Sequence, residues 1–188
     1  TRQGANPMPF AEQLAVIDAT VEAGGRVYGQ ATTRSINALF SFESYLPFDA
    51  LPVWRELREL PLAEQRVRLQ DRNVIASLVA QEANMRPRDN VFQGGGAATT
   101  DPRKPDYHNL YALNGVAWDD PSVAELSEQT GKHPVEVMVN LALDNNMQQL
   151  FLQPLVNEVP AEVRTMLEHP RTLATFSDSG AHVCQEMG

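Results

Sequence analysis

The stretch that decides the fold is Leu-Ala-Thr-Phe-Ser-Asp-Ser-Gly-Ala-His, residues 173–182. Its first five residues predict a short strand that ends directly before Asp178, and Gly180 then permits a tight turn. In α/β barrels, residues at the carboxyl ends of strands face the active site. A carboxylate placed there binds a divalent metal, accepts a proton from water and returns it to a leaving group. Asp178 is therefore the candidate catalytic residue, and His182 lies close enough in sequence to bind substrate or orient Asp178.

The same stretch has a structural interpretation. Ser-Asp-Ser-Gly, residues 177–180, is also an ordinary turn sequence, in which the Asp side chain accepts hydrogen bonds from nearby backbone amides. The residue types alone leave the catalytic and the structural interpretation open.

The first part of the chain predicts a helix followed by a strand. Apolar residues recur at helical spacing over residues 9–23, and Gly24-Gly25 ends the pattern. Residues 26–33, Arg-Val-Tyr-Gly-Gln-Ala-Thr-Thr, predict a buried strand. Helix, glycine stop and strand form half of a βαβ unit, so we expect strands separated by helices to pair in parallel.

The rest of the chain is rich in helical patterns. Residues 48–83 predict two or three short helices, because Pro52 and Pro61 interrupt the pattern. Residues 85–106 predict a loop, whose Gly-Gly-Gly centre lacks the Gly-Lys-Ser/Thr of a phosphate-binding loop. The further predicted elements are a short strand within 108–118, a helix over 120–131, a helix from Pro134, a strand at 149–153 and a helix from Pro160 to His169-Pro170.

Composition indicates a globular chain and excludes some partners. Of 188 residues, 43% are hydrophobic and 21% are charged, and no apolar run is long enough to span a bilayer. A net charge of −9 repels phosphate backbones, so we expect no nucleic-acid partner. Cys184 is the single cysteine and has no partner set for a nucleophile, and no signal peptide is evident at the start. A reducing compartment, such as a bacterial cytoplasm, is expected.

Three stretches together carry a resemblance to a known family. They are residues 177–182 with the preceding Met-Leu-Glu-His-Pro at 166–170, the helical residues 48–62, and Leu-Ser-Glu-Gln-Thr-Gly-Lys-His-Pro-Val-Glu at 126–136. In this order they resemble the late part of the catalytic barrel in D-aminoacylase-like amidohydrolases, also called N-acyl-D-amino-acid deacylases. The resemblance implies an α/β chain that is a partial (β/α)₈ barrel. It would comprise about the seventh strand, a helical insertion at 48–170, and the eighth strand with its Asp turn, in one fragment spanning 1–188.

The resemblance also implies a set of site residues and a cofactor. Asp178 corresponds to the last-strand aspartate, which acts in proton transfer and as a metal ligand. The substrate would be an N-acyl-D-amino acid or a similar amide. The seventh strand departs from the Tyr-Pro-Tyr of many family members, because it ends in Gln-Ala-Thr-Thr-Arg at 30–34. Arg34 would lie near the mouth of the barrel, where two interpretations stay open: a clamp for the substrate carboxylate or an ordinary surface arginine. His182 would contribute to substrate binding. Zinc would be the cofactor of the parent enzyme.

The sequence departs from the family at the metal site. The family carries an H-x-H pair on its first strand, and no such pair occurs among the four histidines here. Because zinc sites need three or four protein ligands, we expect this fragment to hold no metal stably and to be inactive in isolation. Two other interpretations stay open: a non-catalytic, self-associating helix-rich domain that forms a homo-oligomer, and a small-molecule-binding module that uses Arg34 and the glycine-rich loop.

Overall fold

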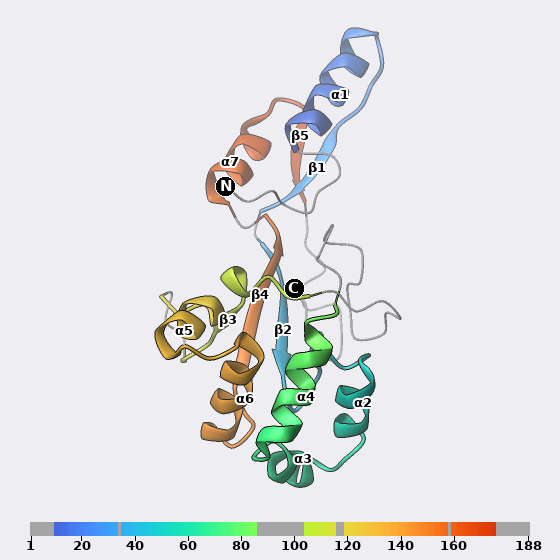
Figure 1. Ribbon diagram of the computed structural model, residues 1–188. Helices are drawn as coiled ribbons and strands as arrows, with labels where there is room; N and C mark the ends of the chain where they lie inside the picture. The colour runs from blue at the N-terminus through green and yellow to red at the C-terminus, as the bar shows by residue number, and fades with distance from the viewer. Residues whose placement is uncertain (1–9, 34, 86–103, 116–118, 158, 176–188) are drawn as a thin grey trace. The chain divides into compact units, whose positions relative to one another are not determined.

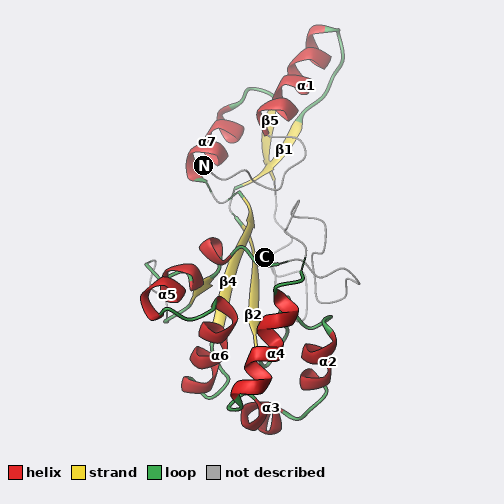
Figure 2. Cartoon of the chain, in the orientation of Figure 1, coloured by secondary structure: helices red, strands yellow, loops and turns green. Residues whose placement is uncertain are grey.

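The computed structural model describes residues 10–33, 35–85, 104–115, 119–157 and 159–175 (Figure 1). Helices and strands alternate irregularly along a mixed α/β chain (Figure 2). The elements are α1 (Phe10–Glu22), β1 (Gly29–Thr32), β2 (Ile36–Ser41), α2 (Pro52–Arg58), α3 (Leu62–Arg68), α4 (Arg72–Glu82), a 3₁₀ turn (Tyr107–Asn109), β3 (Tyr111–Ala112), α5 (Val123–Thr130), α6 (Pro134–Asp144), β4 (Leu150–Val156), α7 (Pro160–Glu168) and β5 (Thr172–Thr175).

The chain divides into two compact units. Unit 1 comprises residues 1–38 and 154–188, and unit 2 comprises residues 39–153. Both boundaries fall inside strands, one in β2 and the other in β4. Unit 2 therefore interrupts unit 1 in sequence, as an insertion does, and it overlaps most of the helical insertion predicted at 48–170.

Unit 1 is built on two short parallel strands. β1 pairs with β5 over four residues, from Gly29 beside Thr172 to Thr32 beside Thr175. Helix α7 packs against both strands, and α1 packs against α7. His169 Nε2, at the end of α7, lies 3.2 Å from an Asp18 carboxylate oxygen of α1, which links the two helices. Each strand of the pair is thus preceded by its own helix, the local order expected for consecutive βα units.

Unit 2 contains the larger hydrophobic core. Its sheet has the strand order β2-β4-β3, and its helices pack in the pairs α2 with α3, α2 with α4, α4 with α6, and α5 with α6. Trp54 is fully buried and stacks on Phe48, with ring centroids 4.7 Å apart. Phe42 belongs to the same cluster, and its ring centroid lies 6.2 Å from that of Trp54. Large buried aromatic rings of this kind contribute most of the burial energy of a core.

Local sequence signals set the helix ends. Ser122 and Glu125 form a capping box at the start of α5, in which each side chain bonds the other residue's backbone N–H. Gly131 ends α5 with φ 67°, a left-handed conformation that glycine adopts without strain. Pro52, Pro134 and Pro160 occupy the first turns of their helices, where the missing N–H has no intrahelical partner to lose.

The sequence predictions agree with most of these elements. The helices at 9–23, 48–83, 120–131, 134 onward and 160–169 are confirmed, with shifts of a few residues at their ends. Strand β2 was not predicted. Parallel pairing is confirmed for β1 with β5 and wrong for β3 with β4, which are antiparallel. A connection that contains two helices, α5 and α6, is long enough to return the chain in either direction.

Candidate functional site

The structure does not describe the three residues predicted for the site. Arg34, Asp178 and His182 lie outside the described residues, as does Cys184. The structure does describe the strands that precede Arg34 and Asp178 in the sequence. Arg34 comes two residues after the end of β1, and Asp178 comes three residues after the end of β5.

The two strands end at one edge. Their parallel register places Thr32 beside Thr175, the last residue of each strand. The Thr175 hydroxyl donates a hydrogen bond of 3.2 Å to the Ala31 carbonyl oxygen, which fixes this end of the pair. In open and closed α/β sheets the carboxyl edge of parallel strands is the usual place for ligands. The candidate site is therefore this edge of unit 1.

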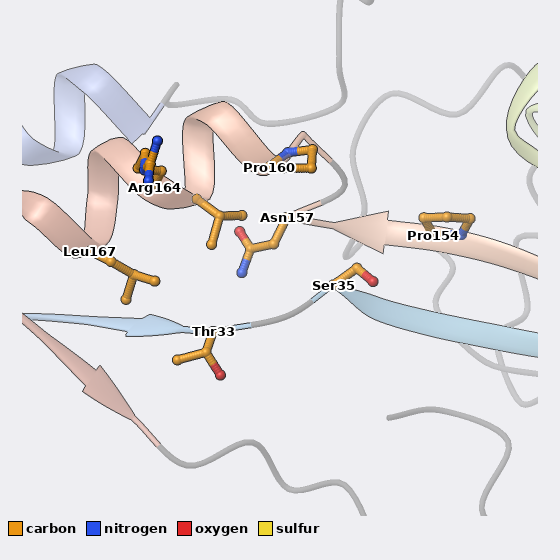
Figure 3. A pocket seen from close by; sticks show the side chains of 8 residues that line it. Thr33, Ser35, Pro154, Asn157, Pro160, Arg164 and Leu167 are labelled. Atoms are coloured by element: carbon orange, nitrogen blue, oxygen red, sulfur yellow. The ribbon is translucent and has the colours of Figure 1, made fainter. Parts of the chain in front are cut away.

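A hollow of about 460 Å³ lies next to this edge, and we call it the β1 hollow. Its lining comes from the residues after β1, the end of β4 and one face of α7 (Figure 3). These residues are Thr33, Ser35, Pro154, Asn157, Pro160, Val163, Arg164 and Leu167. Figure 3 shows Asn157 and Leu167 projecting into the space between α7 and the segment that carries Thr33. All of the lining belongs to unit 1.

Asn157 has the least common backbone conformation in the lining. Its φ is 57°, in the left-handed region that costs most residues about 1 kcal/mol or more and that Asn tolerates better. Its side-chain amide donates a hydrogen bond to the Thr32 hydroxyl, so the last residue of β1 is tied to the chain that leaves β4. A left-handed residue held by a specific contact beside a cavity motivates a functional hypothesis for that cavity.

A second polar cluster lies in the core of unit 2. The Glu82 side chain is fully buried, and its Oε1 accepts a hydrogen bond of 2.7 Å from the Tyr107 hydroxyl. Lys104 Nζ lies 3.0 Å from the same oxygen, and His133 Nε2 lies 3.6 Å from Glu82 Oε2. Burial and the adjacent Glu82 carboxylate together raise the pKa of the Tyr107 hydroxyl far above its ordinary value. The cluster joins α4, the segment before β3 and the start of α6.

This cluster has a structural explanation. His133 is the N-cap of α6, and its Nδ1 accepts a hydrogen bond of 3.2 Å from the Val135 N–H. The helix predicted from Pro134 thus has His133 as its N-cap. A buried carboxylate needs charged or hydrogen-bonding neighbours, and Tyr107 and Lys104 supply them at Oε1, while His133 Nε2 lies 3.6 Å from Oε2. Glu82 lies in the helical pattern predicted over 48–83, and no local sequence signal distinguished it from the other acidic residues there.

The described residues supply no metal site. Over 10–33, 35–85, 104–115, 119–157 and 159–175, no group of three or more His, Cys, Asp or Glu side chains is arranged to hold an ion. In the same ranges every helix is too short or too polar to cross a bilayer.

Comparison with protein-family models, with curated protein sequences and with solved structures gives no significant match.

Proposed function

We propose that the chain is part of a metal-dependent hydrolase that cleaves the amide bond of N-acyl-D-amino acids or related compounds. In this proposal β1 and β5 are neighbouring strands of a (β/α)₈ barrel, and unit 2 is an insertion between them. Asp178, after β5, is the carboxylate that transfers protons. The single cysteine supports a reducing compartment such as the bacterial cytoplasm.

One observation carries the proposal: β1 and β5 are parallel neighbours although the whole of unit 2 separates them in sequence. Parallel neighbours need a crossover connection, and in barrels a helix precedes each successive strand. Helix α7 precedes β5 and packs against both strands, in keeping with that arrangement. The resemblance of residues 166–182 to the end of an amidohydrolase barrel adds the chemistry, because it assigns Asp178 a role at the carboxyl end of β5.

The sparse packing of unit 1 supports a larger sheet. Among its described residues, the buried hydrophobic side chains are Ala31, Ala38 and Val163, and none of them is large. Tyr28 is 54% exposed and Leu173 is 55% exposed, and no residue of α1 is buried. Parallel sheets are normally covered on both faces, so two strands of four residues with α7 packed against them are a poor independent unit. Further strands of a barrel would cover these side chains.

The proposed chemistry assigns one step to this chain. Asp178 accepts the proton of the water that attacks the amide carbonyl and then gives that proton to the departing amine. The metal of the parent enzyme supplies water activation when bound. The described residues and the sequence offer no complete ligand set, because H-x-H is absent, so the proposal places most metal ligands on the rest of the barrel.

The test is complementation. The chain is co-expressed with a barrel half that carries the H-x-H strand, and hydrolysis of N-acetyl-D-leucine is compared with that of N-acetyl-L-leucine in zinc-containing buffer. We expect turnover that favours the D-enantiomer and falls by about 10²–10⁴-fold in Asp178→Asn. Asp144→Asn, which removes a carboxylate at the end of α6 in unit 2, is the matched control and should leave turnover unchanged. Absence of D-amide turnover, or turnover indifferent to Asp178, would count against the proposal.

The exposed strands of unit 1 also favour a second candidate, a non-catalytic domain that self-associates. Edge strands without charged residues pair readily with another chain, and β5, Thr-Leu-Ala-Thr, carries no charge. In that case light scattering should give a dimer or larger species, and Leu173→Lys should return it to the monomer. A chain that stays monomeric from about 1 to about 100 µM, a range that covers typical weak interface affinities, would exclude this candidate.

A further inference from the structure

We propose that the β1 hollow binds a small carboxylate that carries a short alkyl tail. Its volume of about 460 Å³ lies within the range of small-molecule sites, which is on the order of 300–1,000 Å³. Its described lining residues divide into an apolar part, a polar part and the cation Arg164, and each part constrains the ligand. The inference depends on the geometry of unit 1 alone, so it stands apart from the proposed amide hydrolysis.

The apolar part of the hollow comes mainly from α7. Pro160, Val163 and Leu167 recur at intervals of three and four residues, so they share one face of the helix. Val163 is 8% exposed and forms part of the small core of unit 1, and Pro154 extends the apolar lining from β4. This surface matches an alkyl group, and none of the described lining residues is acidic.

The polar part comes from both chain segments at the edge. Thr33 and Ser35 place hydroxyl groups in the lining after β1, and Asn157 places its amide there after β4. The Thr33 and Ser35 hydroxyl groups can donate to carboxylate oxygens, while the Asn157 amide donates to the Thr32 hydroxyl. The left-handed conformation of Asn157 and its bond to Thr32 keep this side chain between α7 and the Thr33 segment (Figure 3).

The cation selects the charge of the ligand. Arg164 is the charged residue among the described lining residues, and its Nε lies 3.3 Å from a Glu168 carboxylate oxygen. Glu168 one turn later is not part of the lining. The two side chains are 78% and 70% exposed, so their mutual attraction is weak and a second carboxylate can compete for Arg164. Guanidinium binds carboxylates in a two-pronged geometry, so a carboxylate head group suits Arg164.

The two exposed residues provide a matched pair of variants. Arg164→Gln removes the cation, and Glu168→Gln removes the internal competitor, while neither change touches a buried group. Sodium octanoate is the probe and 1-octanol is its uncharged analogue, both titrated into ¹⁵N-labelled full chain by NMR in the presence of EDTA. We expect octanoate to shift the Asn157 side-chain amide and the Thr33, Ser35 and Val163 amides. Binding should weaken about threefold to fivefold in Arg164→Gln and tighten about threefold in Glu168→Gln, the scale of an exposed ion pair.

Other results would overturn the inference. The inference fails if octanoate causes no shifts at these residues up to a concentration on the order of 10 mM. A dissociation constant weaker than this corresponds to a binding free energy under about 3 kcal/mol, which is too small for a specific site. Equal binding of octanol and octanoate, or an Arg164→Gln variant that binds octanoate as the wild type does, removes the role of the cation. Because EDTA removes metal and Asp178 is not involved, a negative result here leaves the complementation test of the hydrolase intact.

Discussion

Replacing Tyr107 with Phe tests the buried cluster of unit 2. In the folded chain the Tyr107 hydroxyl donates to Glu82 Oε1 at 2.7 Å, and both side chains are buried. The substitution removes this bond and leaves the rest of the ring in place. A hydrogen bond to a charged group contributes about 1.5–3 kcal/mol, so we expect the free energy of unfolding to fall by about 2 kcal/mol near pH 8.

The same cluster predicts how that loss depends on pH. Because the folded-state pKa of Tyr107 is raised above its ordinary value of 10.0, the stability that this group contributes is fully present below pH 10. It is lost as the pH rises from 10 toward the folded-state pKa, since only the unfolded chain then releases the proton. At pH 11 the wild type should have lost about 1.4 kcal/mol through this group, while Tyr107→Phe has no proton to release. The deficit of the variant should therefore shrink from about 2 to under about 1 kcal/mol.

Urea denaturation at pH 8, 10 and 11 measures this difference, followed by tryptophan fluorescence to which buried Trp54 contributes. Comparing variant with wild type at each pH cancels the titration of groups that both proteins share. Tyr111→Phe is the control at pH 8, because its hydroxyl donates to the neutral Asn109 amide oxygen at 3.2 Å, and its loss should be nearer 1 kcal/mol. A Tyr107→Phe deficit that stays constant or grows up to pH 11 would refute the reasoning.

Three further substitutions test the account of unit 2. Trp54→Ala removes the ring that stacks on Phe48 and should cost about 3–5 kcal/mol, measured by urea denaturation; a cost under about 1 kcal/mol would show that the aromatic cluster is not the core. Gly131→Ala forces a side chain into a left-handed conformation and should cost about 1–2 kcal/mol in thermal unfolding, although a Cβ there meets no atom within 4 Å. Gly131→Asn should cost less, and equal losses would speak against a conformational origin. Ser122→Ala breaks the capping box of α5 and should cost about 1 kcal/mol, whereas an unchanged midpoint would mean that the cap contributes nothing.

Local signals account for the elements that the sequence predicted. Prolines mark the helix starts through their fixed φ, at Pro52, Pro61, Pro134 and Pro160. Gly131 marks a helix end through its positive φ. Both effects act within one turn of the chain. These positions predicted the breaks between α2 and α3 and the starts of α6 and α7 within a few residues. Strand β5 followed from its β-branched and apolar composition in the same way.

Features that depend on distant partners were not predictable. Strand β2 is Ile-Asn-Ala-Leu-Phe-Ser, whose pattern is not a clean alternation, and it pairs with β4 more than a hundred residues later. Glu82 belongs to α4, whose other charged residue, Arg72, is exposed, and only the fold brings Tyr107 and His133 to Glu82. The division into two units likewise arises from contacts that no local pattern contains.

The candidate site shows the same limit. The sequence pointed to Arg34, Asp178 and His182, which lie outside the described residues, so those roles stay predictions. The β1 hollow combines residues after β1, the end of β4 and α7, and none of its lining residues was singled out by sequence except the helix start at Pro160. The parallel pairing of β1 with β5 was expected from the sequence and is present in the structure.

The most direct test of the central claim is one measurement on two samples, the purified chain alone and the chain complemented by an H-x-H barrel half. Zinc content after dialysis is determined by elemental analysis, and N-acetyl-D-leucine hydrolysis is assayed on the same material. The account predicts no stoichiometric zinc and no turnover for the chain alone, and zinc with Asp178-dependent turnover for the complemented sample. Near-stoichiometric zinc with turnover in the chain alone, lost in Asp178→Ala, would mean that a complete site assembles here. Complemented turnover that persists in Asp178→Ala would contradict the role of Asp178 itself.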